Sequence, residues 1–117
     1  MDFDVHLLHH ERCTLVRVQG ELDVVSRERF EEAMGGVLDT GGPMIIDMRE
    51  VTFCDSTGLN AIVMANRRAT ERGTLVALIA LTPRVERVFR ITGVDKFIPI
   101  YDTLREALGA LPTDHTA

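Results

Sequence analysis

Residues 75–81 form the stretch that most narrows the possible folds, because they are apolar throughout and show no alternation with polar residues. A strand of this kind is buried on both faces, which is typical of central strands in parallel sheets covered by helices. Parallel neighbours need crossover connections of a dozen or more residues, usually a helix. The stretch therefore predicts an α/β domain in which strands and helices alternate.

The rest of the chain fits this alternation. We expect five strands, over residues 5–9, 13–19, 44–48, 75–81 and 97–100, and four helices, over residues 26–38, 59–73, 83–93 and 103–111. The short polar turn at 10–12 makes the first strand antiparallel to the second, and the helical connections make the others parallel. The expected fold class is α/β, with a mixed, mostly parallel five-stranded sheet and four helices.

Local signals mark the helix starts and one sheet edge. Pro99 lacks a backbone N–H, so the strand that contains it is expected at an edge. The four expected N-caps are Ser26, Ser56, Thr82 before Pro83, and Thr103 in a capping box with Glu106.

Length and charge limit the function classes. The 117 residues suit one domain, expected over 1–112 with a short flexible tail over 113–117. The net charge of -5 argues against nucleic acid and against an anionic membrane surface as partners. No apolar run approaches the roughly 20 residues of a membrane span, and the acidic N-terminus lacks a signal-peptide pattern. We therefore expect a cytoplasmic protein in which Cys13 and Cys54 are reduced, buried thiols.

No arrangement of catalytic or metal-binding residues emerges. The chain has neither a GxxxxGK[ST] loop nor a GxGxxG loop, and Cys54 is followed by Asp55, the wrong charge for activating a thiolate. Asp39-Thr40-Gly41 is interpreted as turn chemistry. We expect no enzyme activity, no metal and no cofactor in the chain itself. The histidines lack metal-ligand spacing and are expected to be solvated or packed: His6, His9, His10 and His115.

The segment Asp55-Ser56-Thr57-Gly58-Leu59 lies where an apolar strand gives way to an amphipathic helix. On spacing alone, Ser56 is a helix cap and Gly58 allows close packing of the helix start. The same exposed hydroxyl, at the positive end of a helix, is also a place where a phosphate is tolerated. The residues alone leave both interpretations open.

Three motifs together strongly resemble the anti-sigma factor antagonist family, the stand-alone STAS-domain proteins of bacterial sporulation and stress pathways. They are Gly20-Glu21-Leu22-Asp23, then Asp55-Ser56-Thr57-Gly58-Leu59, then Arg90-Ile91-Thr92-Gly93-Val94, at spacing similar to the family's. The resemblance covers about residues 5–111 and implies a STAS-like fold, in agreement with the expected order of strands and helices.

The resemblance also implies a partner switch in transcription regulation. The unphosphorylated protein would bind an anti-sigma factor that is also a serine kinase, and thereby release a sigma factor. The kinase, which carries the ATP, would phosphorylate Ser56 and break the complex, and a metal-dependent serine phosphatase would reverse the modification. The implied partner-binding residues are Asp23, Asp55, Ser56, Thr57, Gly58 and Asn60.

Two positions depart from the family pattern. Asn60 stands where the family often has a small residue, and Cys54 where a larger apolar residue is usual. Both lie near the expected contact surface and bear on which partner is bound. The alternative function is a STAS-type nucleotide- or ligand-sensing or scaffold module that phosphorylation does not control.

Overall fold

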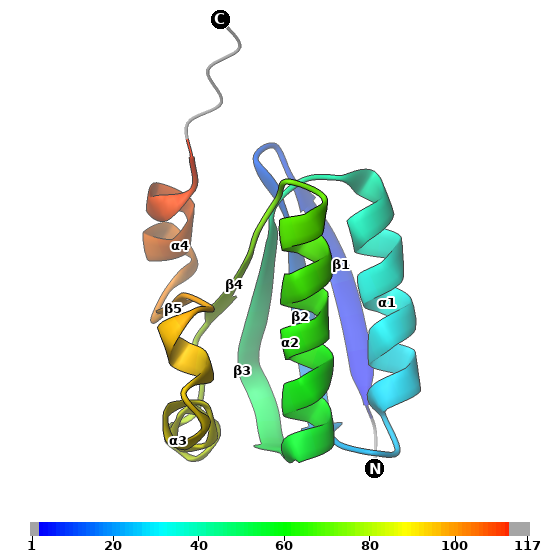
Figure 1. Cartoon of the computed structure of the whole chain (residues 1–117), viewed down its shortest axis with the longest axis vertical. Helices are drawn as coiled ribbons and strands as arrows, with labels where there is room; N and C mark the ends of the chain where they lie inside the picture. The colour runs from blue at the N-terminus through cyan, green and yellow to red at the C-terminus, as the bar shows by residue number, and fades with distance from the viewer. Residues whose placement is uncertain (1–2, 113–117) are drawn as a thin grey trace, which may run out of the picture.

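The computed structural model describes residues 3–112; the expected tail and His115 lie outside them. Strands and helices alternate after an initial hairpin (Figure 1). The elements are β1 (Asp4–His10), β2 (Cys13–Leu22), α1 (Arg27–Thr40), β3 (Met44–Cys54), α2 (Ser56–Glu71), β4 (Val76–Ile79), α3 (Pro83–Thr92), the 3₁₀ helix η1 (Val94–Lys96), β5 (Ile100–Tyr101) and α4 (Leu104–Ala110).

The strands form one mixed sheet in the order β1-β2-β3-β4-β5. β1 pairs antiparallel with β2, and every later neighbour is parallel. The expected fold class, with its single antiparallel strand and four α-helices, is confirmed. The parallel strands therefore point the same way, and β2, β3 and β4 run toward the lower end of the sheet in Figure 1, where α1, α2 and α3 begin.

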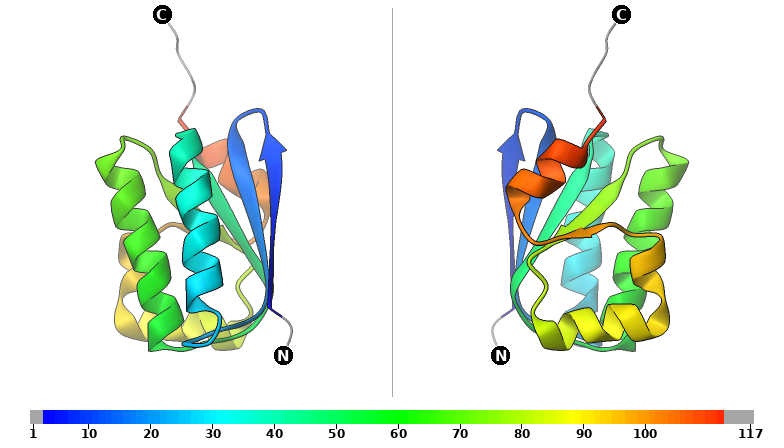
Figure 2. Two further views of the ribbon diagram at one scale, coloured as in Figure 1. Left: turned by 90° about the vertical axis from the view of Figure 1, so that its right-hand side faces the viewer. Right: turned by 90° about the vertical axis from the view of Figure 1, so that its left-hand side faces the viewer.

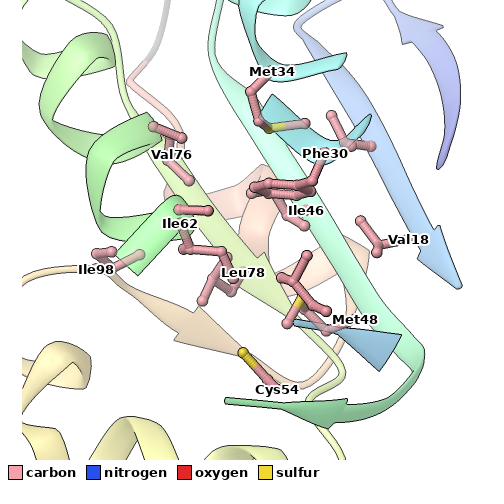
Figure 3. Packing of buried hydrophobic residues seen from close by; sticks show 14 of the residues in the cluster. Val18, Phe30, Met34, Ile46, Met48, Cys54, Ile62, Val76, Leu78 and Ile98 are labelled. Atoms are coloured by element: carbon pink, nitrogen blue, oxygen red, sulfur yellow. The ribbon is translucent and has the colours of Figure 1, made fainter. Parts of the chain in front are cut away.

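The main hydrophobic core lies between one face of the sheet and helices α1, α2 and α3. Phe30 of α1 and Ile62 of α2 are fully buried there against Ile46 and Leu78 of the sheet (Figure 3). The helices supply one apolar stripe each, which is why their sequences show helical periodicity.

The opposite face of the sheet is covered mainly by α4, which lies apart from the other helices (Figure 2). Ile45, Ala77 and Ile79 pack there against Ala107 and against Leu111, the residue that follows the helix. Because β4 is covered on both faces, its side chains are all buried, and this explains the unbroken apolar run.

β2 and β3 are longer than the hydrophobic pattern predicts. We expected them to end at residues 19 and 48, but they continue to Leu22 and Cys54. Two register shifts interrupt their pairing, and Gly20 adopts a φ of 108°, which only glycine adopts readily. The irregular pairing disturbs the alternation of buried and exposed residues. The last residues of β2 and β3, which lead into the loops of the site, are therefore not recognisable as strand from the sequence.

The last strand is also shifted from its expected place. Residues 94–96 form η1, and the strand β5 covers only Ile100–Tyr101 rather than 97–100. Pro99 lies just before the strand, where its carbonyl accepts a hydrogen bond from the Leu78 backbone at 2.9 Å. Because it has no N–H, Pro99 can accept a hydrogen bond from β4 but cannot donate one. The expectation of an edge position is confirmed.

Candidate functional site at the start of helix α2

The loop after β2 and the start of α2 lie side by side. Leu22 and Cys54 are paired at the ends of the parallel strands β2 and β3. The Asp55 backbone N–H donates to the Leu22 carbonyl at 3.3 Å, one residue beyond that pair. Asp23 and Asp55 therefore follow the ends of neighbouring strands, and the Gly20-Asp23 and Asp55-Leu59 motifs meet at this end of the sheet.

Asp55, and not Ser56, is the N-cap of α2. Its backbone is extended, and its Oδ1 accepts a hydrogen bond from the Gly58 backbone N–H at 2.9 Å. Ser56 is the first helical residue and is exposed. The predicted cap is wrong because the carboxylate one position earlier satisfies the helix N–H. Within residues 3–112 the Ser56 hydroxyl forms no hydrogen bond, so its structural task is small.

Gly58 lies where α2 comes closest to β2. A Cβ atom at this position would lie 2.8 Å from Leu22 Cγ and 2.9 Å from Leu22 C, and it would also meet the Leu22 carbonyl oxygen. These separations are too short for a stable contact, so only glycine fits without a shift. Gly58 is buried, so the structure gives it a role in packing, and its predicted contact with a partner stays a prediction.

The loop after β2 is held by Asp23 and Ser26. Asp23 Oδ1 accepts from the backbone N–H groups of Val25 at 3.0 Å and of Ser26 at 3.2 Å. Ser26 Oγ accepts from the Asp23 backbone N–H at 3.0 Å and donates to the Glu21 carbonyl at 2.6 Å. Ser26 occupies the N-cap position of α1, but its side chain makes no cap hydrogen bond because the hydroxyl is turned back toward β2.

The remaining predicted site residues divide into exposed and buried ones. Asn60 is exposed on α2 one turn after Ser56, so the two share a face of the helix. Thr57 is half-buried. Cys54 is buried and points into the core (Figure 3), so it can affect a partner only through packing. Burial, with a smaller contribution from Asp55, raises the pKa of the Cys54 thiol to about 12.

Three exposed apolar side chains at this end of the molecule were missed by the sequence reasoning. Val24 is 72% exposed, Val25 is 85% exposed and Phe53 is 40% exposed. Two consecutive valines between Asp23 and Ser26 were a usable signal, because turn residues are usually polar or glycine. The exposed end of the sheet is therefore partly apolar.

The site is a surface rather than a cavity. A hollow of about 480 Å³ lies at the opposite end of the sheet, beside the ends of α1 and α2, and is lined in part by Arg12, Gly41 and Gly73. Over residues 3–112 no three His, Cys, Asp or Glu side chains gather in a way that could hold a metal ion. The helices within that range are also too short or too polar to cross a membrane. The geometry near Ser56 favours binding a protein surface.

Comparison with known proteins agrees with this geometry. Residues 4–107 match the model of the STAS domain family. The anti-sigma-B factor antagonist of Bacillus subtilis is 30% identical over 100 residues, which are 86% of this chain and 92% of that protein.

Solved structures give the same result. The crystal structure of an anti-sigma factor antagonist from Mycobacterium paratuberculosis matches with a TM-score of 0.86 and 30% identity over 93% of each chain. The Bacillus cell fate determinant SpoIIAA in its phosphorylated form shares the fold, with a TM-score of 0.69 and 20% identity over 92% of this chain and 97% of that one. The chain therefore belongs to the STAS-domain family of anti-sigma factor antagonists.

Proposed function

We propose that this chain, in its unphosphorylated form, binds an anti-sigma factor with serine kinase activity in the cytoplasm, and that phosphorylation of Ser56 ends this binding. A metal-dependent serine phosphatase restores the binding form. The observation that carries the proposal is the exposed Ser56 hydroxyl on the first residue of α2, next to a carboxylate that already caps the helix.

The location suits a phosphate in the uncomplexed protein. A phosphate on Ser56 adds a charge of about -1.5 to -2 and three acceptor oxygens. The N-terminus of α2 has backbone N–H groups and a positive dipole end that stabilise such an anion by about 0.3–1 kcal/mol. Repulsion from Asp55 opposes this gain, so the domain should stay folded with little change in stability.

In the complex, the anti-sigma factor would lie directly against the phosphate on Ser56. A dianion enclosed in a protein interface without a compensating cation costs several kcal/mol. A loss of about 4 kcal/mol weakens binding about a thousandfold. Modification therefore acts on the complex far more than on the domain, which is the requirement for a reversible switch.

The comparisons support two parts of this proposal. The matched proteins of Bacillus subtilis and Mycobacterium paratuberculosis are named anti-sigma factor antagonists. The phosphorylated form of SpoIIAA has the same fold as this chain, which supports the expectation that a phosphate leaves the fold unchanged. The position of the phosphate on Ser56 is what the resemblance of the Asp55-Ser56-Thr57-Gly58-Leu59 motif implies, and the exposure of the hydroxyl supports it.

The test uses a purified anti-sigma factor kinase from the same genome, with ATP, and reads intact mass and phosphopeptides. The wild-type chain should gain one phosphate on Ser56, Ser56→Ala should gain none, and the neighbouring control Thr57→Ala should be modified like wild type. Modification on Thr57 with Ser56 untouched would contradict the site. Calorimetric titration of the kinase with modified and unmodified chain should give a difference in Kd of about a thousandfold.

The alternative module would behave differently in the same assay. A nucleotide- or ligand-sensing domain would leave the mass unchanged with every kinase tried. It would bind nucleotide in the absence of a kinase, and Ser56→Asp would not alter any protein complex that it forms.

A further inference from the structure

Val24 and Val25 are two adjacent apolar side chains that are largely exposed to solvent. They are 72% and 85% exposed, next to each other, at the tip of the loop between β2 and α1. Single exposed apolar side chains are common on protein surfaces and need no explanation. Two neighbours on one loop form a local apolar surface, which we call the valine tip.

The loop that carries the valine tip is fixed by hydrogen bonds. Asp23 Oδ1 accepts from the Val25 and Ser26 backbone N–H groups, and Ser26 Oγ connects the Asp23 backbone N–H to the Glu21 carbonyl. Ser26 itself is only 4% exposed. β-branched side chains also have few rotamers. The valines are therefore held out in one arrangement, and a partner would lose little conformational entropy by covering them.

The valine tip and Ser56 belong to the same edge of the sheet. Leu22 pairs with Cys54, so Val24 and Ser56 each lie two residues beyond a paired position on neighbouring strands. The backbone N–H of Asp55, one residue before Ser56, donates to the Leu22 carbonyl at 3.3 Å, so the loop that carries Val24 leaves β2 beside the start of α2. Figure 1 shows the loop between β2 and α1 passing beside the start of α2. A protein that covers Ser56 would also reach the valine tip.

We propose that Val24 and Val25 are the apolar anchor by which the anti-sigma factor holds this chain, and that the partner presents an apolar recess there. The inference rests on the proposed function and extends it to residues outside the motif around Ser56. Burying two exposed apolar side chains in an interface from which water is excluded adds affinity through the apolar area removed from water.

The anchor also explains why a charge on Ser56 is so costly to the complex. Beside a dry apolar contact, a phosphate has little water, and the loop of residues 23–26 supplies the carboxylate of Asp23 and no cation; Arg27, the first residue of α1, is paired with Glu31 at 3.2 Å. The effect of the charge should therefore depend on the valines. If the valines are made polar, water enters the contact and the charge becomes easier to tolerate.

The test measures the Kd between the chain and a purified anti-sigma factor kinase that phosphorylates it. The double variant Val24→Ser and Val25→Ser should bind about 30–100-fold more weakly than wild type. The control is Leu8→Ser on β1, because Leu8 is also 41% exposed but pairs with Leu15, seven residues before the end of β2 at Leu22. The control should bind within about twofold of wild type, and circular dichroism with thermal melting should show all three proteins equally folded.

A double-mutant cycle then tests the link to the switch. Ser56→Asp should weaken the wild-type complex by at least about a hundredfold, and the double valine variant by less than about tenfold. Equal losses in the two backgrounds would overturn the placement of the valine tip beside Ser56 in the complex. A double valine variant that binds as tightly as wild type would overturn the anchor alone. Failure of the wild-type chain to bind any anti-sigma kinase of its genome would overturn the proposed function as well.

Discussion

Replacing Gly58 by alanine adds one methyl group at the closest approach of α2 to β2. The new Cβ would lie 2.8 Å from Leu22 Cγ and 2.9 Å from Leu22 C, with the Leu22 carbonyl oxygen also in contact. The leucine side chain can rotate away, but its carbonyl group belongs to the β2 backbone and is held by the sheet. The helix start must therefore move away from the strand.

Two opposing effects set the size of the change. Alanine is favoured over glycine inside a helix by about 0.8–1 kcal/mol. Overpacking against rigid neighbours costs about 1–3 kcal/mol, and here two of the three close atoms are backbone atoms. Because the clash is with fixed backbone atoms, we take the upper part of the overpacking range, about 2–3 kcal/mol, and expect a net destabilisation of about 1–2 kcal/mol. For a domain of this length this lowers Tm by about 4–8 °C.

The control uses the same substitution at Gly36 in α1. A Cβ at Gly36 meets nothing within 4 Å, so only helix propensity acts there. Gly36→Ala should raise the free energy of unfolding by about 0.5–1 kcal/mol. Urea denaturation of both variants gives the comparison. If Gly58→Ala is as stable as wild type or more so, the close packing between α2 and β2 is not what requires glycine.

Three further results are expected. Asp55→Ala should lower the free energy of unfolding by about 0.5–2 kcal/mol through loss of the cap, while Asp55→Asn should lose clearly less in the same urea titration; equal losses would contradict the capping role. Ser56→Ala should change stability by less than about 0.5 kcal/mol in thermal melts, because the hydroxyl caps nothing; a larger loss would mean that Ser56 supports the helix. Burial raises the pKa of Cys54 from 9.0 to about 12, so the unfolded chain loses this proton first and stability should fall as the pH rises above about 9. Cys54→Val should show a smaller fall between about pH 8 and 11, and an identical pH profile would contradict the assignment.

The starts of α3 and α4 were predictable from sequence, because their capping hydrogen bonds join residues that are close together in the chain. Thr82 accepts from the Val85 backbone N–H with Pro83 at the first helical position, and Thr103 forms its capping box with Glu106. These interactions span three residues, so the sequence contains both partners.

The strand ends could not be predicted in the same way. The extension of β2 to Leu22 depends on pairing with β3 across two register shifts and on the backbone of Gly20. Such pairing joins residues far apart in the chain, and the shifts disturb the alternation that reveals a strand. The ends of β2 and β3 that we predicted from the hydrophobic pattern therefore lie too early in the chain.

The residues of the site were predicted from the sequence, but the structural role of each residue was not. Aspartate and serine are nearly equal as N-caps, so sequence alone does not choose between Asp55 and Ser56. The choice follows from where Gly58 packs on Leu22, which fixes the start of α2. The exposure of Val24 depends likewise on the path of the loop, which the buried Ser26 determines.

The separation of the cap from the neighbouring hydroxyl has a consequence for the amount of protein in the cell. A serine that capped its own helix would make stability, and with it susceptibility to proteolysis, depend on whether it carried a phosphate. Because Asp55 holds the start of α2 through Gly58, both forms of the chain should be degraded at the same rate. Under the proposed function, the signal would then change the ratio of the two forms and leave their total constant. The cell could read that ratio repeatedly without synthesising new protein.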